Sequence, residues 1–272
     1  MQQSASDKAF TGAIPEVYER YMVPMIFAPY ATDLARRAAA LAPASVLEIA
    51  AGTGALTREL ARALPPQAGI VATDLNPPML ARAQGVGIHR PITWQVADAM
   101  HLPFDDGSFD LVVCQFGVMF FPDKPAAFAE ARRVLAPGGT LLFNVWDRIE
   151  DNDFADVVSR TLARLFPDSP PDFMARTPHG YYRQAEIAGH LQQGGFRSAP
   201  GFETLPAASI AASPHIAALA YCHGTPLRAD LEARRPDALQ HATDSCEQAL
   251  AQAFGTGPVE GRMQAHVVAV LA

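Results

Sequence analysis

The chain has 272 residues, a length that corresponds to one large domain or two small ones. Charged residues make up 18% and hydrophobic residues 49%, which is typical of a chain that buries a core and excludes wholesale disorder. The formal net charge of -7 leaves no overall positive field to attract nucleic acid or an anionic membrane surface.

The longest apolar run, residues 111–121, contains Gln and Gly and is shorter than the ~20 residues that cross a bilayer, so we expect no membrane insertion. Residues 1–10 are polar and lack the order of a secretory signal. The cysteines Cys114, Cys222 and Cys246 are too scattered for a disulfide framework, which favours a reducing, cytoplasmic compartment. We also expect no metal site, because no His, Cys or carboxylate grouping has ligand spacing.

Residues 45–146 alternate short apolar runs with helical stretches, the pattern of a parallel sheet with crossover helices. Asn76 is a plausible N-cap with Pro77 at the first helical position, and the turn at 137–139 ends the last helix of this region. The strands are predicted over 45–50, 69–74, 92–98, 109–114 and 140–146, and the helices over 56–64, from 77 onward and over 123–136.

The remainder of the chain is less regular and predicts a helical cap. Helical pieces and proline-rich breaks fill residues 147–182. Helices are also expected before the first strand, over 15–30. The expected later elements are a helix over 184–193, a strand near 196–205, helices across 214–254 and a last strand over 263–271. The domain division that follows is an N-terminal cap over 1–43, a core over 44–147, an insertion of the cap over 148–182, and the end of the core over 183–272, interrupted by the helices at about 214–254.

A turn rich in small residues, from Glu48 to Gly54, lies where the first strand turns into a helix. Small residues let the backbone approach a ligand, and the free amides at a helix start favour a carboxylate or a phosphate. Asp74 ends the second strand about 20 residues later, where a carboxylate can accept hydrogen bonds from ribose hydroxyls. This spacing indicates an adenosine-containing ligand.

The glycine spacing distinguishes between nucleotide types. A dinucleotide fingerprint requires Gly-x-Gly-x-x-Gly, whereas here Gly52 and Gly54 are followed by Ala55, Leu56 and Thr57. A nucleotide-dependent oxidoreductase on a Rossmann-like fold is thereby disfavoured but stays open. A non-catalytic cofactor-binding module that acts through a partner protein is a second alternative.

Five ordered blocks together resemble the class I S-adenosylmethionine-dependent methyltransferases. The first is the acid and small-residue turn at 48–54; the others are residues 71–80, 97–99, 102–110 and 133–139. Over about residues 44–147 the chain is similar to the ubiquinone/menaquinone-biosynthesis (methyltransferase type 11) small-molecule group. The resemblance implies an α/β, Rossmann-like fold with a seven-stranded, mostly parallel sheet, helices on both faces and an appended cap. It also implies S-adenosyl-L-methionine as cofactor and S-adenosyl-L-homocysteine as product, and makes 44–147 the cofactor-binding core.

The resemblance also assigns roles to single residues. Ala50 departs from the family, which more often has glycine there. Leu75 and Met79 pack beside the adenine, and Gln115 and Phe116 lie where the cofactor meets the substrate. The methionine moiety is held by Glu48, Ala50, Ala51, Gly52, Thr53 and Gly54; Asp74 holds the ribose; Asp98 and Ala99 receive the adenine amino group.

Methyl transfer from a sulfonium is an in-line displacement that mainly requires alignment and exclusion of water. Tyr18 and Tyr21 are candidates to flank the sulfonium, with Tyr21 assigned to the cofactor site; the alternative is that both only pack the N-terminal helix. A base is needed only for a hydroxyl or an acidic carbon, and His179 and His223 are the candidates, each with a surface histidine as the alternative.

The cap segments 147–182 and 214–254 are expected to enclose a small, largely apolar or aromatic acceptor, which disfavours a nucleic-acid substrate. His101 is interpreted as loop decoration, and Phe120 and Phe121 as core residues. The acceptor atom and the oligomeric state stay open.

Overall fold

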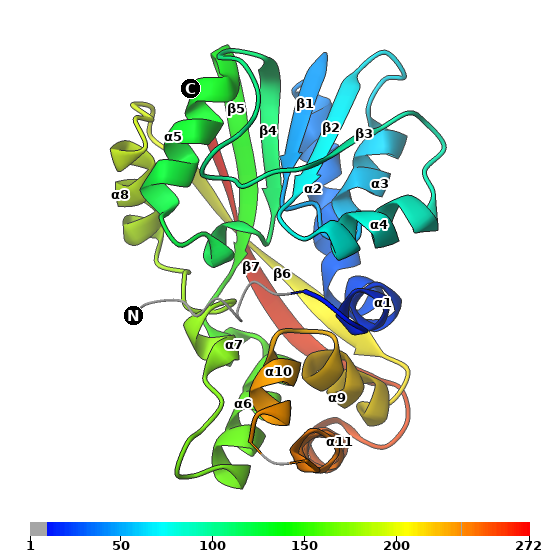
Figure 1. Cartoon of the computed structure of the whole chain (residues 1–272). Helices are drawn as coiled ribbons and strands as arrows, with labels where there is room; N and C mark the ends of the chain where they lie inside the picture. The colour runs from blue at the N-terminus through cyan, green and yellow to red at the C-terminus, as the bar shows by residue number, and fades with distance from the viewer. Residues whose placement is uncertain (1–9, 235) are drawn as a thin grey trace.

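A seven-stranded sheet runs through the molecule in the order β3-β2-β1-β4-β5-β7-β6 (Figure 1). The computed structural model describes residues 10–234 and 236–272. Strands β1 to β5 are mutually parallel, and β7 is antiparallel to both β5 and β6. The strands are β1 Ser45–Ile49, β2 Gly69–Asp74, β3 Thr93–Val96, β4 Phe109–Gln115, β5 Leu135–Trp146, β6 Gly201–Ala211 and β7 Val259–Leu271. The expected seven-stranded, mostly parallel α/β sheet is confirmed.

The helices around this sheet agree with the predicted order of elements. A ten-residue π-helix, η2, covers Tyr18–Phe27, and two short 3-10 turns are η3 Val118–Phe120 and η4 Ile149–Asp151. The α-helices are α1 Ile14–Val17, α2 Ala28–Ala40, α3 Ala55–Ala63, α4 Pro77–Val86, α5 Lys124–Val134, α6 Asp153–Leu165, α7 Phe173–Arg176, α8 Gln184–Gln193, α9 Pro214–His223, α10 Leu227–Glu232 and α11 Ala238–Phe254.

The strand expected at 196–205 was placed too early. Phe196 is buried and its N–H donates to Leu191 O, so it completes the turn after α8. The strand itself pairs residue by residue with β7 over 201–211. Pro206 is tolerated in it because β6 is an edge strand.

The alternating side chains of the strands fill two cores, one on each face of the sheet. Val46, Leu111 and Leu142 point toward α2 and α3, while Leu47, Val112 and Leu141 point the other way, toward a cluster that includes α5 and α8. Because both faces are covered, the parallel strands contain nearly continuous apolar runs.

Strands β6 and β7 extend beyond the parallel strands and carry helices at their far end (Figure 1). We call this part the helical lobe: α6, α7, α9, α10, α11 and the distal halves of β6 and β7. Its core is apolar, with Phe154, Leu162, Leu231 and Leu250 all buried. The 148–182 and 214–254 segments, far apart in sequence, thus pack together.

Helix α1 lies between the helical lobe and α4, whereas α2 packs beside α3 on one face of the sheet (Figure 1). An ion pair of 2.8 Å between Arg58 Nη2 and Glu19 Oε1 ties η2 to α3. Within the described residues, no helix is long and apolar enough to cross a bilayer.

Candidate functional site

A cavity of about 790 Å³, partly open to solvent, lies where β1, β2 and β4 end. This strand-end cavity lies at the carboxyl edge of the parallel strands, where open α/β sheets bind their ligands. It is lined by Phe10, Tyr18, Ile49, Ala50, Gly52, Asp74, Leu75, Asn76, Met79, Ala97, Asp98, Ala99, Met100, Gln115, Phe116, Gly117 and Phe120–Pro122. Nine residues that the resemblance assigned to the cofactor are therefore together: Ala50, Gly52, Asp74, Leu75, Met79, Asp98, Ala99, Gln115 and Phe116.

Asp74 fixes the turn after β1 against the end of β2. Its Oδ2 accepts a 2.8 Å hydrogen bond from Gly52 N, and its Oδ1 accepts one of 2.8 Å from Asn76 N. Only 7% of the residue is exposed, and this burial raises the pKa of its carboxyl although the backbone N–H donors oppose the shift. The carboxylate thus lies in the cavity wall with a fixed orientation.

Glu48 lies behind the turn rather than in the cavity lining. The residue is 1% exposed, and its Oε2 accepts a 2.6 Å hydrogen bond from the Thr57 hydroxyl at the start of α3. Burial raises the pKa of this carboxyl to about 8. Ala51, Thr53 and Gly54, three further residues of the turn, are also outside the lining.

Two non-glycine residues at this edge have left-handed backbones. The φ angle is 56° at Ala50 and 49° at Phe116. The turns that contain these two residues are packed closely, because a Cβ on Gly117 would lie 2.5 Å from Ala50 Cβ and 2.7 Å from Cys114 Sγ. Phe116 N donates a 2.9 Å hydrogen bond to Asn144 Oδ1, which holds the turn after β4. Backbone strain of this kind is concentrated at ligand sites.

The cavity also contains a buried polar atom without a partner. Among residues 10–234 and 236–272, Gln115 Oε1 finds no hydrogen-bond donor, while the same amide donates through Nε2 to Phe27 O at 3.5 Å. An unpaired buried acceptor costs free energy unless a ligand satisfies it. Asp98 is less constrained, since its Oδ1 accepts only from Met100 N, at 2.9 Å.

Of the two candidate tyrosines, the structure places Tyr18 at the site. Its ring stacks on Phe27 at 4.9 Å between centroids, and burial raises the pKa of its hydroxyl far above the usual value. Tyr21 is absent from the cavity linings and packs under Arg20, whose guanidinium lies 5.1 Å from the ring centroid. Sequence spacing alone does not separate the two tyrosines, because the π-helix turns more slowly than the 3.6-residue period.

A second cavity, of about 620 Å³, lies between the strand ends and the helical lobe. We call it the aromatic cavity. It shares Phe10, Tyr18, Phe116 and Phe120 with the strand-end cavity, so the two spaces adjoin. Its other lining residues are Met22, Ile26, Phe27, Trp146, Asn152, Phe154, Phe173, Met174, Pro178, His179, Ser209, Tyr221, Thr225, Pro226 and Met263. Phe120 and Phe121, interpreted from sequence as core residues, pack against the core and also line the strand-end cavity.

The two candidate histidines have different surroundings. His179 lines the aromatic cavity, with its Nδ1 2.9 Å from Asp147 O, and burial lowers its pKa to about 4. His223 ends α9, and its Nε2 lies 3.0 Å from Thr243 Oγ1 on α11. It lines neither cavity, and its partial burial lowers its pKa.

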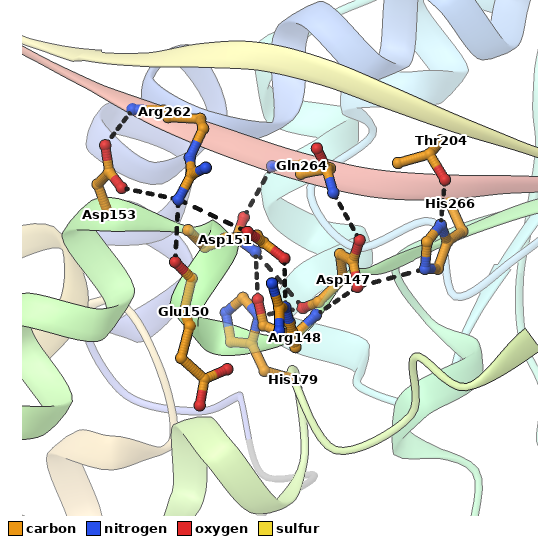
Figure 2. A network of polar contacts seen from close by, with 11 residues as sticks. Asp147, Arg148, Glu150, Asp151, Asp153, His179, Thr204, Arg262, Gln264 and His266 are labelled. Carbon is orange, nitrogen blue, oxygen red and sulfur yellow. Dashed lines mark hydrogen bonds and ion pairs between the residues drawn. The ribbon is translucent and has the colours of Figure 1, made fainter.

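Asp147, the residue after β5, anchors a polar network beside the aromatic cavity (Figure 2). Its carboxylate accepts from Gln264 Nε2 at 2.7 Å and from Arg148 N at 2.7 Å, and lies 3.3 Å from His266 Nε2. His266 Nδ1 lies 2.9 Å from Thr204 Oγ1 on β6. Sequence reasoning missed this network, because the pairing of β5, β6 and β7 that assembles it joins distant residues. Throughout the described residues, no cluster of His, Cys, Asp or Glu is suited to a metal ion.

Comparison with known proteins finds relatives of the region that contains the first five strands. Residues 47–143 match the family described as methyltransferase domain. The malonyl-[acyl-carrier protein] O-methyltransferase of Geobacter sulfurreducens is 37% identical over 164 residues, 59% of this chain and 58% of that protein. The demethylmenaquinone methyltransferase of Thermus thermophilus is 43% identical over 105 residues, 37% of this chain and 46% of that protein.

The matched region spans about half the length of these relatives. A crystal structure of a proposed methyltransferase from Bacillus halodurans superposes with a TM-score of 0.55 at 19% identity, covering 88% of this chain and 97% of that one. This superposition extends the likeness of fold beyond the matched core. Residues 47–143 of this chain thus match the methyltransferase domain family, and the chain as a whole shares the fold of the Bacillus halodurans structure.

Proposed function

We propose that this chain transfers a methyl group from S-adenosyl-L-methionine to a small, largely apolar or aromatic acceptor by in-line displacement. The observation that carries the proposal is the junction of two cavities at Tyr18, Phe116 and Phe120. One cavity presents carboxylates at strand ends, and the other is lined mostly by aromatic and aliphatic side chains. Such an arrangement suits a polar cofactor that meets an apolar acceptor.

The residues of the strand-end cavity fit this cofactor chemically. Asp74 and Asp98 offer carboxylate oxygens to ribose hydroxyls and to an adenine amino group, and Gln115 Oε1 is an acceptor that lacks a partner. When bound, the cofactor supplies a methyl group on a positively charged sulfur. The shared aromatic rings of Tyr18 and Phe116 can face that charge favourably.

The aromatic cavity serves to orient the acceptor and exclude water. Methyl transfer requires collinear reacting atoms more than dedicated catalytic groups, so a shaped apolar wall supplies much of the effect. Both named relatives act on acceptors of their own, but the family match, residues 47–143, leaves out the helical lobe that forms part of this wall. The acceptor is therefore inferred from this chain's own lining.

Calorimetric titration of the purified chain with S-adenosyl-L-methionine and S-adenosyl-L-homocysteine tests the proposal. We expect micromolar binding, weakened at least tenfold in Asp74→Asn, because a hydrogen bond to a charged group contributes ~1.5–3 kcal/mol. Asp244→Asn is the matched control, since Asp244 is exposed on α11 and accepts only from Gln240. Equal affinity in both variants would contradict the role of Asp74.

The same titration, together with an assay of methyl transfer, separates the alternatives. Binding of NADH without binding of either sulfur compound would favour a nucleotide-dependent oxidoreductase. Cofactor binding with no methyl transfer to any small acceptor would favour a binding module that needs a partner protein. The cytoplasmic location stays a prediction, supported by the three unpaired thiols of Cys114, Cys222 and Cys246.

A further inference from the structure

We propose that His179 accepts the proton of a hydroxyl-bearing acceptor, so that this chain methylates the oxygen of a neutral, apolar phenol or enol. The inference rests on the proposed function and names its substrate class. The imidazole of His179 is buried, lines the aromatic cavity and has one ring nitrogen that is not used in a hydrogen bond among the described residues.

The hydrogen bond of His179 fixes its tautomer. Nδ1 lies 2.9 Å from the backbone oxygen of Asp147, and a carbonyl oxygen can only accept. Nδ1 therefore carries the proton and donates it, while Nε2 keeps its lone pair. Within the described part of the chain, Nε2 has no hydrogen-bond partner. Burial lowers the pKa of the ring to about 4, so the neutral form persists at neutral pH.

Other polar groups of the aromatic cavity are not equivalent to this nitrogen. Asn152 Oδ1 accepts from Gln264 N at 3.1 Å, and Thr225 Oγ1 donates to Tyr221 O at 2.9 Å. Tyr18 and Tyr221 keep their protons, because burial raises the pKa of both hydroxyls. They are donors, whereas His179 is a proton acceptor.

The charge of the lining selects a neutral acceptor. No Lys or Arg side chain is among the described residues that line the aromatic cavity. Burying a carboxylate substrate there would leave its charge without a partner, at a high free-energy cost. A phenol or enol enters uncharged and donates its proton to Nε2. Lys124, Arg148 and Arg176 line a separate, open groove that shares only His179 with the aromatic cavity.

The proposed methyl transfer conserves atoms and charge. The acceptor oxygen forms a bond to the methyl carbon while the carbon–sulfur bond breaks and its electron pair stays on sulfur. The hydroxyl proton passes to His179 Nε2. The site holds one positive charge before the transfer, on sulfur, and one after it, on imidazolium. A ring that resists protonation in the free protein therefore becomes protonated as the sulfonium charge disappears.

The charged groups that face His179 support this change. The carboxylates of Asp147 and Glu150 both favour the protonated ring, although burial outweighs them in the free protein. Asp147 acts as a positioning residue, since its backbone oxygen orients the imidazole and its side chain is fixed by Gln264 and His266 (Figure 2). Trp146 packs beside the ring at 5.9 Å between centroids and limits its rotation.

The first test reads the tautomer directly. We expect the nitrogen NMR shifts of labelled His179, assigned with His179→Gln, to report a neutral ring protonated at Nδ1 down to about pH 5. Binding of 4-nitrophenol to the complex with S-adenosyl-L-homocysteine should shift the Nε2 resonance. A ring protonated at Nε2, or charged at neutral pH, would overturn the inference.

The second test measures methyl transfer to 4-methylphenol, 4-chlorophenol and 4-nitrophenol, with aniline and benzoate as competing acceptor classes. His179→Gln should lower kcat by ~10²–10⁴-fold for 4-methylphenol, the usual contribution of a general base. The loss should shrink for 4-nitrophenol and at higher pH, where the hydroxyl ionises without help. Cofactor affinity should stay within twofold in this variant.

His223→Gln is the matched control, because His223 lies outside both cavities, and its kcat should equal that of the unaltered chain. Equal losses for all three phenols would indicate a merely structural His179. Transfer to aniline or benzoate but to no phenol, or no His179-dependent binding of 4-nitrophenol, would also overturn the inference. Failure of cofactor binding would instead overturn the proposed function.

Discussion

Ala50 and Gly117 show how residue-scale strain shapes the strand-end cavity. Ala50 has a φ of 56°, and its Cβ lies where a side chain at Gly117 would extend. The resemblance flagged Ala50 as a departure from the more common glycine, but the sequence does not reveal what its methyl group contacts. The structure shows that the methyl group fills space that Gly117 leaves open across the turn after β4.

Gly117→Ala should destabilise the fold by ~1–3 kcal/mol, the cost of overpacking a filled space. Ala50→Gly in the same chain should recover part of this loss, because it removes the contact that would be 2.5 Å. Recovery should be incomplete, since Cys114 Sγ stays 2.7 Å away. Urea denaturation of the two single variants and the double variant measures the coupling, and strict additivity would contradict it.

Single residues were predicted unevenly. Nine assigned residues line the strand-end cavity because the blocks that contain them follow the ends of parallel strands, whose positions the apolar pattern fixes. Glu48 lies behind the turn, since it shares a face of β1 with Val46 and faces α3, where the Thr57 hydroxyl donates to it. Tyr18 lines both cavities and Tyr21 lines neither, because the helix that carries both tyrosines is a π-helix, which no sequence pattern indicates.

At the scale of elements, η2 covers the cavities and is attached to the core by the ion pair of Glu19 with Arg58. Both side chains are mostly buried, at 12% and 13% exposure. Arg58 also donates to Thr53 O at 2.8 Å, so one guanidinium connects η2 to the turn after β1. A second ion pair, Arg82 with Glu16, ties α1 to α4 at 3.0 Å but is more exposed.

Arg58→Met should loosen η2, because it leaves the buried carboxylate of Glu19 without its partner. We expect ~3 kcal/mol lower stability, faster proteolysis within η2 and at least tenfold weaker binding of S-adenosyl-L-homocysteine. Arg82→Met is the matched control, with a loss of ~0–1 kcal/mol expected for an exposed pair. Equal effects of the two variants would contradict the role of the Glu19–Arg58 pair.

The elements themselves were largely predictable, whereas the helical lobe was not. Periodicity and turn residues locate β1, β2 and α8 almost to the residue. By contrast, β6 was predicted too early because the buried Phe196 belongs to a turn, while the strand contains alternating, half-exposed residues. How α6 and α9 meet depends on packing between distant segments, which local sequence patterns do not specify.

At the scale of the whole molecule, two buried titratable groups make stability depend on pH in opposite directions. The folded-state pKa of His179 is about 4, below the usual 6.5, so the unfolded chain binds more protons between these values. The folded-state pKa of Glu48 is about 8, above the usual 4.5, so the folded chain binds more protons in that interval.

The stability that the neutral His179 ring contributes is therefore present above pH 6.5 and is lost as the pH falls toward 4. The stability that protonated Glu48 contributes is present below pH 4.5 and is lost as the pH rises through 8. Relative to His179→Phe, the unaltered chain should lose up to ~1.4 kcal/mol per pH unit on acidification, and relative to Glu48→Gln a similar amount on alkalinisation. Urea midpoints measured from pH 5 to 9 provide both difference curves, and a flat curve would contradict the burial of that group in its neutral form.

We predict that a cofactor and an acceptor meet where the strand-end and aromatic cavities adjoin. The most direct test is a crystal structure of the chain with S-adenosyl-L-homocysteine. We predict the ribose at Asp74, the adenine beside Asp98 and Met79, and the sulfur directed toward Phe116 and the aromatic cavity. A sulfur facing solvent, or a ligand bound outside the strand-end cavity, would contradict the account.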